Sequence, residues 1–228
     1  MSAFYSFFYH ALTQPLTNIL VFFYNTIAVR DLGLAIIFLT LFIRFLLFPL
    51  FHKSTRQQLI LQRLQPRLKE IQKEFKEDKV KQTEAMMALY AEHGVNPFSG
   101  ILFLIIQIPI LIILYRIFLT GLAPGKMAAL YSFVANPGVL HTSFLGLINL
   151  DNRSIVMVVL AAVLQYFQAK TALPPKDPSR QLSPTEAATR NMVLIGPLIT
   201  LLIFWRLPAA VALYWVVSSA ISIGQQII

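Results

Sequence analysis

The stretch LGLAIIFLTLFIRFLLFPLF, residues Leu32–Phe51, decides the fold of this chain. It contains 20 residues, and Arg44 is the one charged residue among them. An apolar run of this length is long enough to cross a bilayer. A guanidinium keeps its charge at neutral pH, and placing it inside a span costs about 2.5–3.5 kcal/mol on insertion scales. Arg44 is therefore a candidate functional residue.

The composition of the whole chain indicates a membrane protein with several spans. Of 228 residues, 57% are hydrophobic and 13% are charged, and the mean hydropathy is +0.66. A soluble domain averages about 25% charged residues, so a large soluble domain is excluded. The chain has no cysteine, which excludes disulfides and thiolate metal sites. Residues 1–16 lack the basic region and the cleavage site of a signal peptide.

Four further apolar segments predict an all-α membrane protein with five transmembrane helices. The polar residues in these spans, described below, are expected to form a hydrophilic groove that opens to the cytoplasm and is surrounded by the five helices. The predicted parts are an outer-side interfacial amphipathic helix (1–31), a first span (32–51), a cytoplasmic helical hairpin (52–97), a second span (98–120), an external loop (121–153), a third span (154–170), a cytoplasmic loop (171–190), a fourth span (191–206) and a fifth span (207–228).

The first part is amphipathic. Residues 3–29 place apolar side chains at helical spacing on one side and polar side chains on the other, as in a helix that lies in the membrane interface. Pro15 is expected to break or kink this helix. The alternative is that Leu16–Val29 forms an extra span, which has only 14 residues.

The charged segment after the first span has the pattern of a two-helix hairpin. Leucines and other apolar residues recur every three or four positions between residues 61 and 75, Asp78 to Lys81 is typical of a turn, and Gly94 is placed as a helix stop. Met86, Met87 and Tyr90 are the candidate contact residues of this hairpin. The alternative is that the methionines only pack its two helices together.

The distribution of basic residues predicts the topology. The hairpin and the 170–190 segment, which lie on one side of a five-span protein, hold thirteen of the 19 Lys and Arg residues. Basic loops stay in the cytoplasm, so we expect the N-terminus outside and the C-terminus in the cytoplasm. Arg44 precedes Lys53 by nine residues, or about 13 Å of helix. It is then in the cytoplasmic half of the membrane.

Arg44 is expected to face a wet cavity that opens to the cytoplasm. Pairing with a buried acid is disfavoured because no Asp or Glu lies in the five predicted spans, and snorkelling over about 13 Å exceeds the reach of one side chain. Gln107, Gln168, Tyr214 and Trp215 also lie in spans and need hydrogen-bond partners there. Each of them alone is typical of contacts between helices. Together with Arg44 they predict a shared substrate-binding groove.

Enzymatic and metal-binding patterns are missing from the sequence. The four histidines are scattered without metal-ligand spacing, and the predicted spans contain no pair of carboxylates. The segment GLAPGK at 121–126 is one residue too short for a phosphate-binding loop and lacks its Ser or Thr. We therefore expect no enzyme activity, no catalytic residue, no metal and no cofactor. The net charge of +9 reflects membrane topology, and no direct nucleic-acid recognition is expected.

An ordered set of short motifs resembles the YidC/Oxa/Alb family of membrane-protein insertases, in its short five-span bacterial form. The motifs are Ile43-Arg44 with Pro49-Leu50, LQPRLKEIQ at 64–72, MMALY at 86–90, HGVNP at 93–97, QIPI at 107–110 with LY at 114–115, Pro208 with LYW at 213–215, and QQ at 225–226. The resemblance covers essentially the whole chain. Two departures are Ala210 in place of a glycine and Ser218-Ser219 in place of an asparagine.

The resemblance implies a positively charged groove that opens to the cytoplasm and to lipid and is closed on the outer side. Arg44, Gln168 and Trp215 match the groove positions of the family, and Gln107 and Tyr214 are added to them. The implied function is the insertion and folding of nascent membrane proteins in the bacterial cell membrane. The implied partners are nascent membrane proteins, the lipid bilayer, the ribosome, the signal recognition machinery and the general secretory channel.

Two other classes of function stay open at this point. A small transporter or channel would use Arg44 to bind an anionic solute, but it needs a pathway to both sides, and the outer halves of the first and third spans are apolar. A non-catalytic subunit that packs on a translocation channel is the third class.

Overall fold

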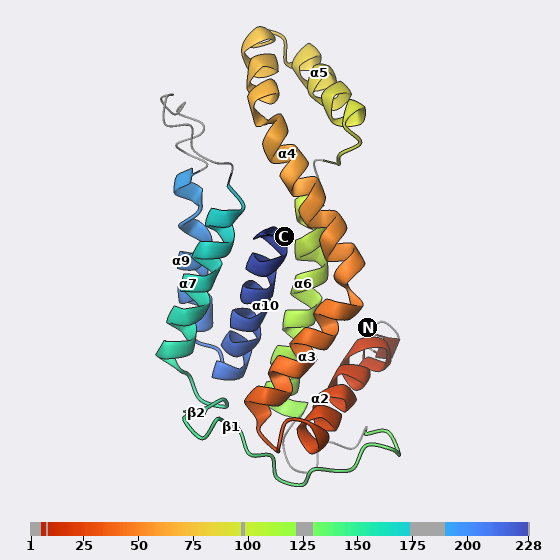
Figure 1. Cartoon of the computed structure of the whole chain (residues 1–228), viewed down its shortest axis with the longest axis vertical. Coiled ribbons are helices and arrows are strands. Elements are labelled where there is room, and N and C mark those ends of the chain that lie inside the picture. Colours follow the sequence, from red (N-terminus) through yellow and green to blue (C-terminus); the bar gives the residue numbers. More distant parts are fainter. Residues whose placement is uncertain (1–5, 8, 97–98, 122–129, 174–189, 228) are drawn as a thin grey trace.

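The described part of the chain is mostly helical (Figure 1). The computed structural model describes residues 6–7, 9–96, 99–121, 130–173 and 190–227. The elements in chain order are η1 (Tyr9–Thr13, a π-helix), α2 (Gln14–Thr26), α3 (Leu32–Leu46), α4 (Phe48–Glu74), α5 (Lys79–Glu92), α6 (Ser99–Arg116), η2 (Ile117–Gly121, a π-helix), β1 (Ser143–Phe144), β2 (Ile148–Asn149), α7 (Ile155–Thr171), α9 (Ile195–Phe204) and α10 (Ala209–Ile227).

The amphipathic N-terminal segment forms two short helices that meet at the predicted break. Pro15 lies in the first turn of α2, a position that proline tolerates because the N–H it lacks has no partner within the helix. The polar side of α2 binds the backbone of residues 131–141. Asn18 accepts a hydrogen bond from the amide of Tyr131 (2.7 Å), and the hydroxyl of Tyr24 accepts one from the amide of His141 (2.8 Å). Helix α2 is thereby held to this segment by both residues.

The predicted first span is divided between two helices. Helix α3 ends at Leu46, and α4 begins at Phe48 with Pro49 in its first turn. The axes of α3 and the first part of α4 differ by 68°. Proline lacks the N–H that would continue the helical hydrogen bonds, so the chain bends where Pro49 starts a new helix.

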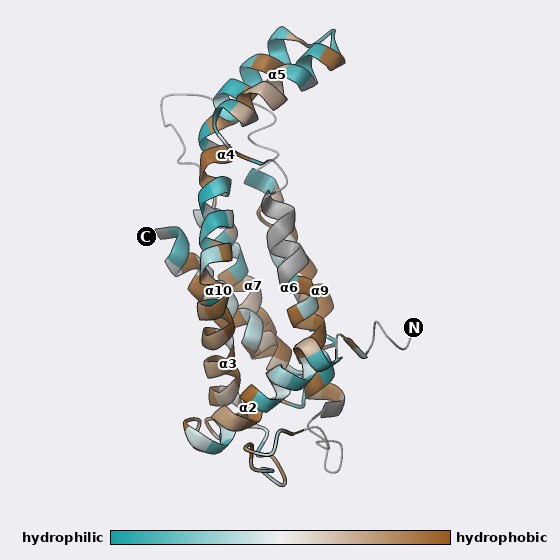
Figure 2. Cartoon of the chain, turned by 90° about the vertical axis from the view of Figure 1, so that its right-hand side faces the viewer, coloured by the Kyte–Doolittle hydropathy of each residue, from teal (hydrophilic) through white to brown (hydrophobic). Residues whose placement is uncertain are grey.

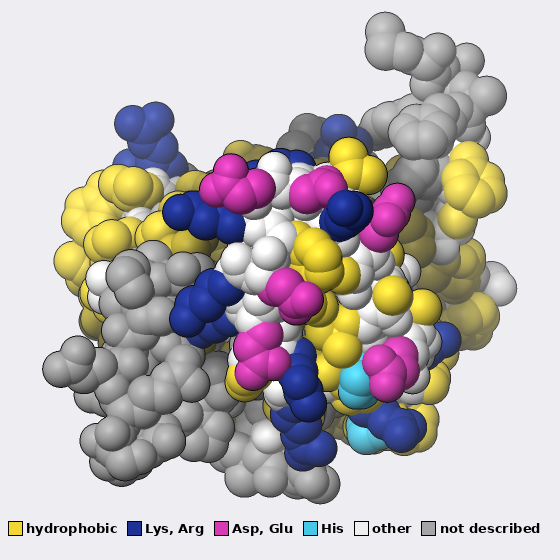
Figure 3. Space-filling view, turned by 90° about the horizontal axis from the view of Figure 1, so that it is seen from above, with side chains coloured by type: hydrophobic (Ala, Val, Ile, Leu, Met, Phe, Trp, Pro, Cys, Tyr) yellow, Lys and Arg dark blue, Asp and Glu magenta, His cyan; other side chains and the backbone are white. Residues whose placement is uncertain are grey.

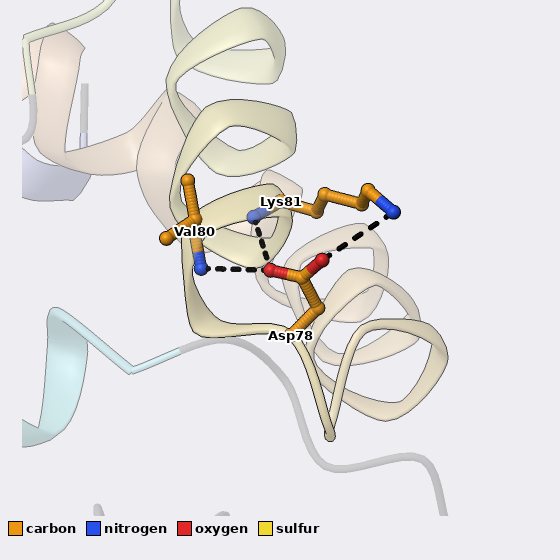
Figure 4. A network of polar contacts seen from close by, with 3 residues as sticks. All are labelled: Asp78, Val80 and Lys81. Atoms are coloured by element: carbon orange, nitrogen blue, oxygen red, sulfur yellow. Dashed lines mark hydrogen bonds and ion pairs between the residues drawn. The ribbon is translucent and has the colours of Figure 1, made fainter.

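Helices α4 and α5 form the predicted hairpin, and it projects from one end of the molecule (Figure 1). Asp78 begins α5, because its carboxylate accepts hydrogen bonds from the amides of Val80 (3.1 Å) and Lys81 (3.0 Å) and pairs with the Lys81 ammonium (3.4 Å; Figure 4). Hydrophilic residues gather on α5 and the distal part of α4, whereas α3, α9 and α10 are mainly hydrophobic (Figure 2).

At the opposite end, residues 130–154 run past the ends of the helices (Figure 1). The two short strands in this segment, β1 and β2, pair antiparallel, with Phe144 opposite Ile148. The carbonyls of Asn152 and Leu150 accept hydrogen bonds from the amides of Ala209 (2.8 Å) and Ala210 (3.1 Å). These two amides belong to the first turn of α10, where no helical acceptor is available, so the segment caps that helix.

The larger apolar core joins α2, α3, α6, α7, α9 and α10, with members such as Leu20, Ile36, Leu114, Val158 and Val211. Within the described ranges no single helix is both long and apolar enough to cross a membrane alone, whereas α3 and the Phe48–Leu61 part of α4 pass that test together across their bend.

Candidate functional site

Arg44 lies inside the helical bundle, where only 5% of its surface is exposed. Its Nη2 donates a hydrogen bond to the backbone carbonyl of Ser218 on α10, at 3.0 Å. The ring of Phe51 on α4 covers the guanidinium, with its centroid 4.4 Å from Cζ. This is the geometry of a cation–π contact. Three helices, α3, α4 and α10, therefore fix the position of this charge.

Gln107 and Tyr214 form a second buried polar contact beside it. The amide Nε2 of Gln107 on α6 donates to the hydroxyl of Tyr214 on α10 at 2.7 Å, and each residue is 2% exposed. Tyr214 and Ser218 are four residues apart on α10, so they lie on one face of that helix. We name Arg44, Gln107, Tyr214 and Ser218 the arginine cluster. It joins polar groups from α3, α6 and α10.

The carbonyl of Ser218 accepts hydrogen bonds from two side chains. One donor is Nη2 of Arg44 and the other is the hydroxyl of Ser222, at 3.0 Å, and both residues are buried. Ser218, Ser219 and Ser222 are all buried on α10, and Thr40 is buried on α3, where its hydroxyl donates to the carbonyl of Ile36 at 2.7 Å. The Ser218 carbonyl therefore links the Arg44 guanidinium to the hydroxyl of Ser222.

A separate polar contact joins α7, α9 and α10. The carbonyl oxygen of Gln165 accepts hydrogen bonds from the hydroxyl of Thr200 and from the indole N–H of Trp215, the latter at 3.3 Å. The ring of Phe204 meets Trp215 edge-on, with centroids 5.3 Å apart. We name Gln165, Thr200 and Trp215 the tryptophan cluster. Tyr214 and Trp215 are consecutive, so α10 takes part in both clusters.

The structure brings four of the five predicted groove residues into these two clusters and leaves the fifth outside them. Gln168 is half-buried on α7, and its backbone carbonyl accepts the Thr171 hydroxyl at 3.0 Å. Gln165, three residues earlier, is the glutamine that contacts Trp215. Gln165 is also a polar residue within the apolar third segment, and it lies only about one turn of helix from Gln168. The sequence pattern alone does not tell which of the two glutamines contacts Trp215.

The three predicted contact residues of the hairpin differ in how far they are exposed. Met86 and Tyr90 pack against the hairpin's own core of Leu64, Leu68 and Val95, whereas Met87 is 48% exposed. Partial burial raises the pKa of Tyr90 above its usual value. Viewed from the hairpin end, acidic and basic side chains surround a small apolar patch (Figure 3). Met87 is thus the one of the three predicted contact residues that is exposed.

The chemistry that this arrangement offers is electrostatic. A permanently charged guanidinium surrounded by hydroxyl and amide groups favours a negatively charged group more strongly than it would in water, because the surroundings have a low dielectric constant. Within the part of the chain that the structure describes, no cluster of three or more His, Asp or Glu side chains is placed to hold a metal ion.

The helical fold, the apolar composition and the buried polar clusters are those of a helical membrane protein. Residues 22–228 match the family described as 60Kd inner membrane protein. The chain belongs to this family, which is the YidC/Oxa/Alb family that its motifs resemble, and the prediction from those motifs is confirmed.

Several relatives carry the name membrane protein insertase YidC. The relative from Clostridium tetani is 36% identical over 197 residues, covering 86% of this chain and 80% of that protein. The relative from Fusobacterium nucleatum is 29% identical over 223 residues, which are 97% of this chain and 96% of that protein. The one from Magnetococcus marinus is 31% identical over 218 residues, which are 96% of this chain but 35% of that protein. The chain thus spans about a third of some relatives and most of others.

Proposed function

We propose that this protein inserts nascent membrane proteins into the bilayer and helps them fold, using the arginine cluster as a temporary binding site for their polar tails. The observation that supports this proposal most is the burial of Arg44 within an apolar bundle. A charge inside a membrane segment is costly, and such residues commonly mark a substrate pathway. The names of the relatives agree with this activity.

The physical task is to move a short polar tail across a layer of low dielectric constant while its helix enters lipid. A hydrated groove that reaches Arg44 from the cytoplasm would shorten the dry part of this path and so lower the desolvation cost. The guanidinium then gives an acidic tail residue a partner near mid-membrane. No bond is hydrolysed. Apolar transfer and the membrane potential, about 2.3 kcal/mol per charge per 100 mV, drive the process.

Helix α7 offers the arriving helix a route into lipid. One of its faces exposes large apolar side chains, namely Ile155, Val156, Val159, Leu160, Val163 and Phe167. In the proposed mechanism the tail binds near Arg44 while the hydrophobic segment slides along this face. Apolar surface of this kind gives it an environment similar to lipid, so leaving the protein costs little.

In the proposed orientation the hairpin lies in the cytoplasm and the N-terminus lies outside, as the basic residues predict. The exposed Met87 is then the candidate first contact for a substrate, the ribosome, the signal recognition machinery or the secretory channel. The 171–190 loop would be on the same side, and its residues 174–189 lie outside the described residues.

The test is insertion by purified protein in phospholipid vesicles, with substrates whose external tails carry either acidic or neutral residues. Arg44→Ala is expected to lower insertion of the acidic-tail substrate about tenfold or more, because a hydrogen bond to a charged group contributes about 1.5–3 kcal/mol. Arg44→Lys is expected to retain insertion. Arg206→Ala removes an exposed arginine two residues beyond the end of α9 and serves as the matched control.

Equal insertion by wild type and Arg44→Ala for both substrates would remove Arg44 from the mechanism. The same vesicles separate the other two classes of function. Flux of small anions would favour a transporter, whereas insertion by the protein alone excludes a purely structural subunit.

A further inference from the structure

The end opposite the hairpin carries two tight turns whose tips are apolar and exposed (Figure 1). The first turn, between α2 and α3, exposes 84% of Val29. The second, between β1 and β2, exposes 58% of Leu145 and 84% of Leu147. Neither turn takes part in the clusters around Arg44 and Trp215, so a different role has to explain them.

Both turns hold non-glycine residues in the left-handed region of backbone conformation. The φ angles are 51° for Val29, 61° for Arg30 and 52° for Leu145. This region is unfavourable for residues with a side chain, and most of all for a β-branched one such as valine. A strained backbone that presents an apolar side chain outward persists where the surrounding structure enforces it, and such strain often accompanies function.

Asp31 ties the two turns into one unit. Its Oδ1 accepts a hydrogen bond from the amide of Leu34 at 2.9 Å, which caps α3, and its Oδ2 accepts one from the amide of Leu145 at 2.6 Å. Beside it, Phe144 packs directly on the backbone of Gly33. The exposed tips of both turns are therefore fixed relative to one another and to the start of α3.

The two turns continue an apolar surface on neighbouring elements. Phe22 on α2 and Ile27, directly after that helix, are 45% and 49% exposed and lead into the first turn. Ile155 and Val156, at the start of α7 shortly after the second turn, are also exposed. Several large apolar side chains in one region mark a surface that contacts something apolar. In a member of an inner-membrane family, the apolar partner continuous with such helix faces is lipid.

We propose that the two turns, Val29-Arg30 and Leu145–Leu147, form an anchor that inserts into the lipid leaflet at this end of the bundle. The apolar tips would enter the boundary between headgroups and acyl chains, to the depth of about 5–10 Å that is typical of interfacial elements. The exposed Arg30, next to Val29, would remain at the level of the lipid phosphates. This anchor does not depend on the proposed insertase activity.

The absence of cysteine from the chain makes the test direct, because one introduced cysteine accepts one spin label. Val29→Cys and Leu147→Cys are labelled in vesicles of phosphatidylethanolamine and phosphatidylglycerol, and collisions with oxygen and with a water-soluble nickel complex are measured. Lys73→Cys on the exposed side of α4 calibrates water, and Val156→Cys on α7 calibrates lipid. Circular dichroism confirms that each labelled variant keeps its helix content.

The proposal expects a ratio of oxygen to nickel collisions at positions 29 and 147 that is several-fold above the value at position 73 and closer to the value at position 156. A ratio equal to that at position 73 would show that the turns lie in water and would overturn the anchor. Low collision rates with both reagents would show that protein covers the tips, and would overturn it as well.

Discussion

The close packing of Phe144 on Gly33 decides whether Gly33→Ala stabilises or destabilises the protein. A Cβ added at Gly33 would lie 2.7 Å from the Cβ of Phe144 and nearer still to two atoms of the Phe144 ring. Side-chain atoms do not normally approach each other this closely. Alanine normally favours a helix over glycine by about 1 kcal/mol. Forcing an extra carbon into a filled space costs about 1–3 kcal/mol. Gly33→Ala should therefore be neutral or destabilising by up to about 2 kcal/mol.

The chain contains a matched control for this substitution. Gly224 lies in α10, and nothing stands within 4 Å of the position its Cβ would take. Gly224→Ala should therefore stabilise the protein by up to about 1 kcal/mol. Gly196 is intermediate, since its Cβ would meet the flexible end of Gln165 at 3.0 Å. The measurement is unfolding of the three variants in mixed detergent micelles, followed by circular dichroism.

A double-mutant cycle isolates the contact from other effects of Gly33→Ala. Phe144→Gly removes both the ring and the Cβ that the new methyl group would meet. In that background Gly33→Ala should become neutral or stabilising, which is a coupling of about 1–3 kcal/mol. If Gly33→Ala matched Gly224→Ala in wild-type Phe144, the close packing of this end of α3 on β1 would be refuted.

Three further predictions concern polar contacts. A cycle of Gln107→Leu and Tyr214→Phe should give a coupling of about 0.6–1.7 kcal/mol, as for other hydrogen bonds between membrane helices, and additive unfolding energies would contradict their bond. Gln165→Ala should shift the tryptophan emission spectrum whereas Gln168→Ala should not, and equal shifts would reject the tryptophan cluster. Asp78→Ala should destabilise the hairpin by about 1 kcal/mol in hydrogen-exchange measurements, and unchanged protection of the first turn of α5 would argue against its cap.

The sequence was most informative where a local rule decides the structure. The leucine stripe and Gly94 predicted the two helices of the hairpin, because helical periodicity and C-terminal stops involve residues close along the chain. The turn predicted at Asp78 to Lys81 was wrong, because Asp78 caps α5 and Lys79 to Lys81 form its first turn. The left-handed φ of Gly94, 61°, agrees with its place at the end of α5. The motif set predicted the family, which the match over residues 22–228 confirms.

The partners inside the bundle could not be predicted, because they depend on helices that are distant in sequence. Arg44 and Ser218 are separated by 174 positions, and the acceptor is a backbone carbonyl, which every residue possesses. Gln165 and Gln168 face nearly the same direction, so only the position of α10 decides which one meets Trp215. The division of the first span at Leu47 had a local signal in Pro49, but hydrophobicity alone suggested one continuous helix.

The cap that residues Leu150 and Asn152 place on α10 has a mechanical consequence. Asn152 lies three residues before the start of α7, so α7 and α10 are connected at the end that lies away from the hairpin. If α10 swings away from α3, this connected end acts as a pivot, and the displacement grows along the helices toward the hairpin. A small rotation about this pivot would separate the hairpin-side ends of α3 and α10 while their opposite ends stay close together.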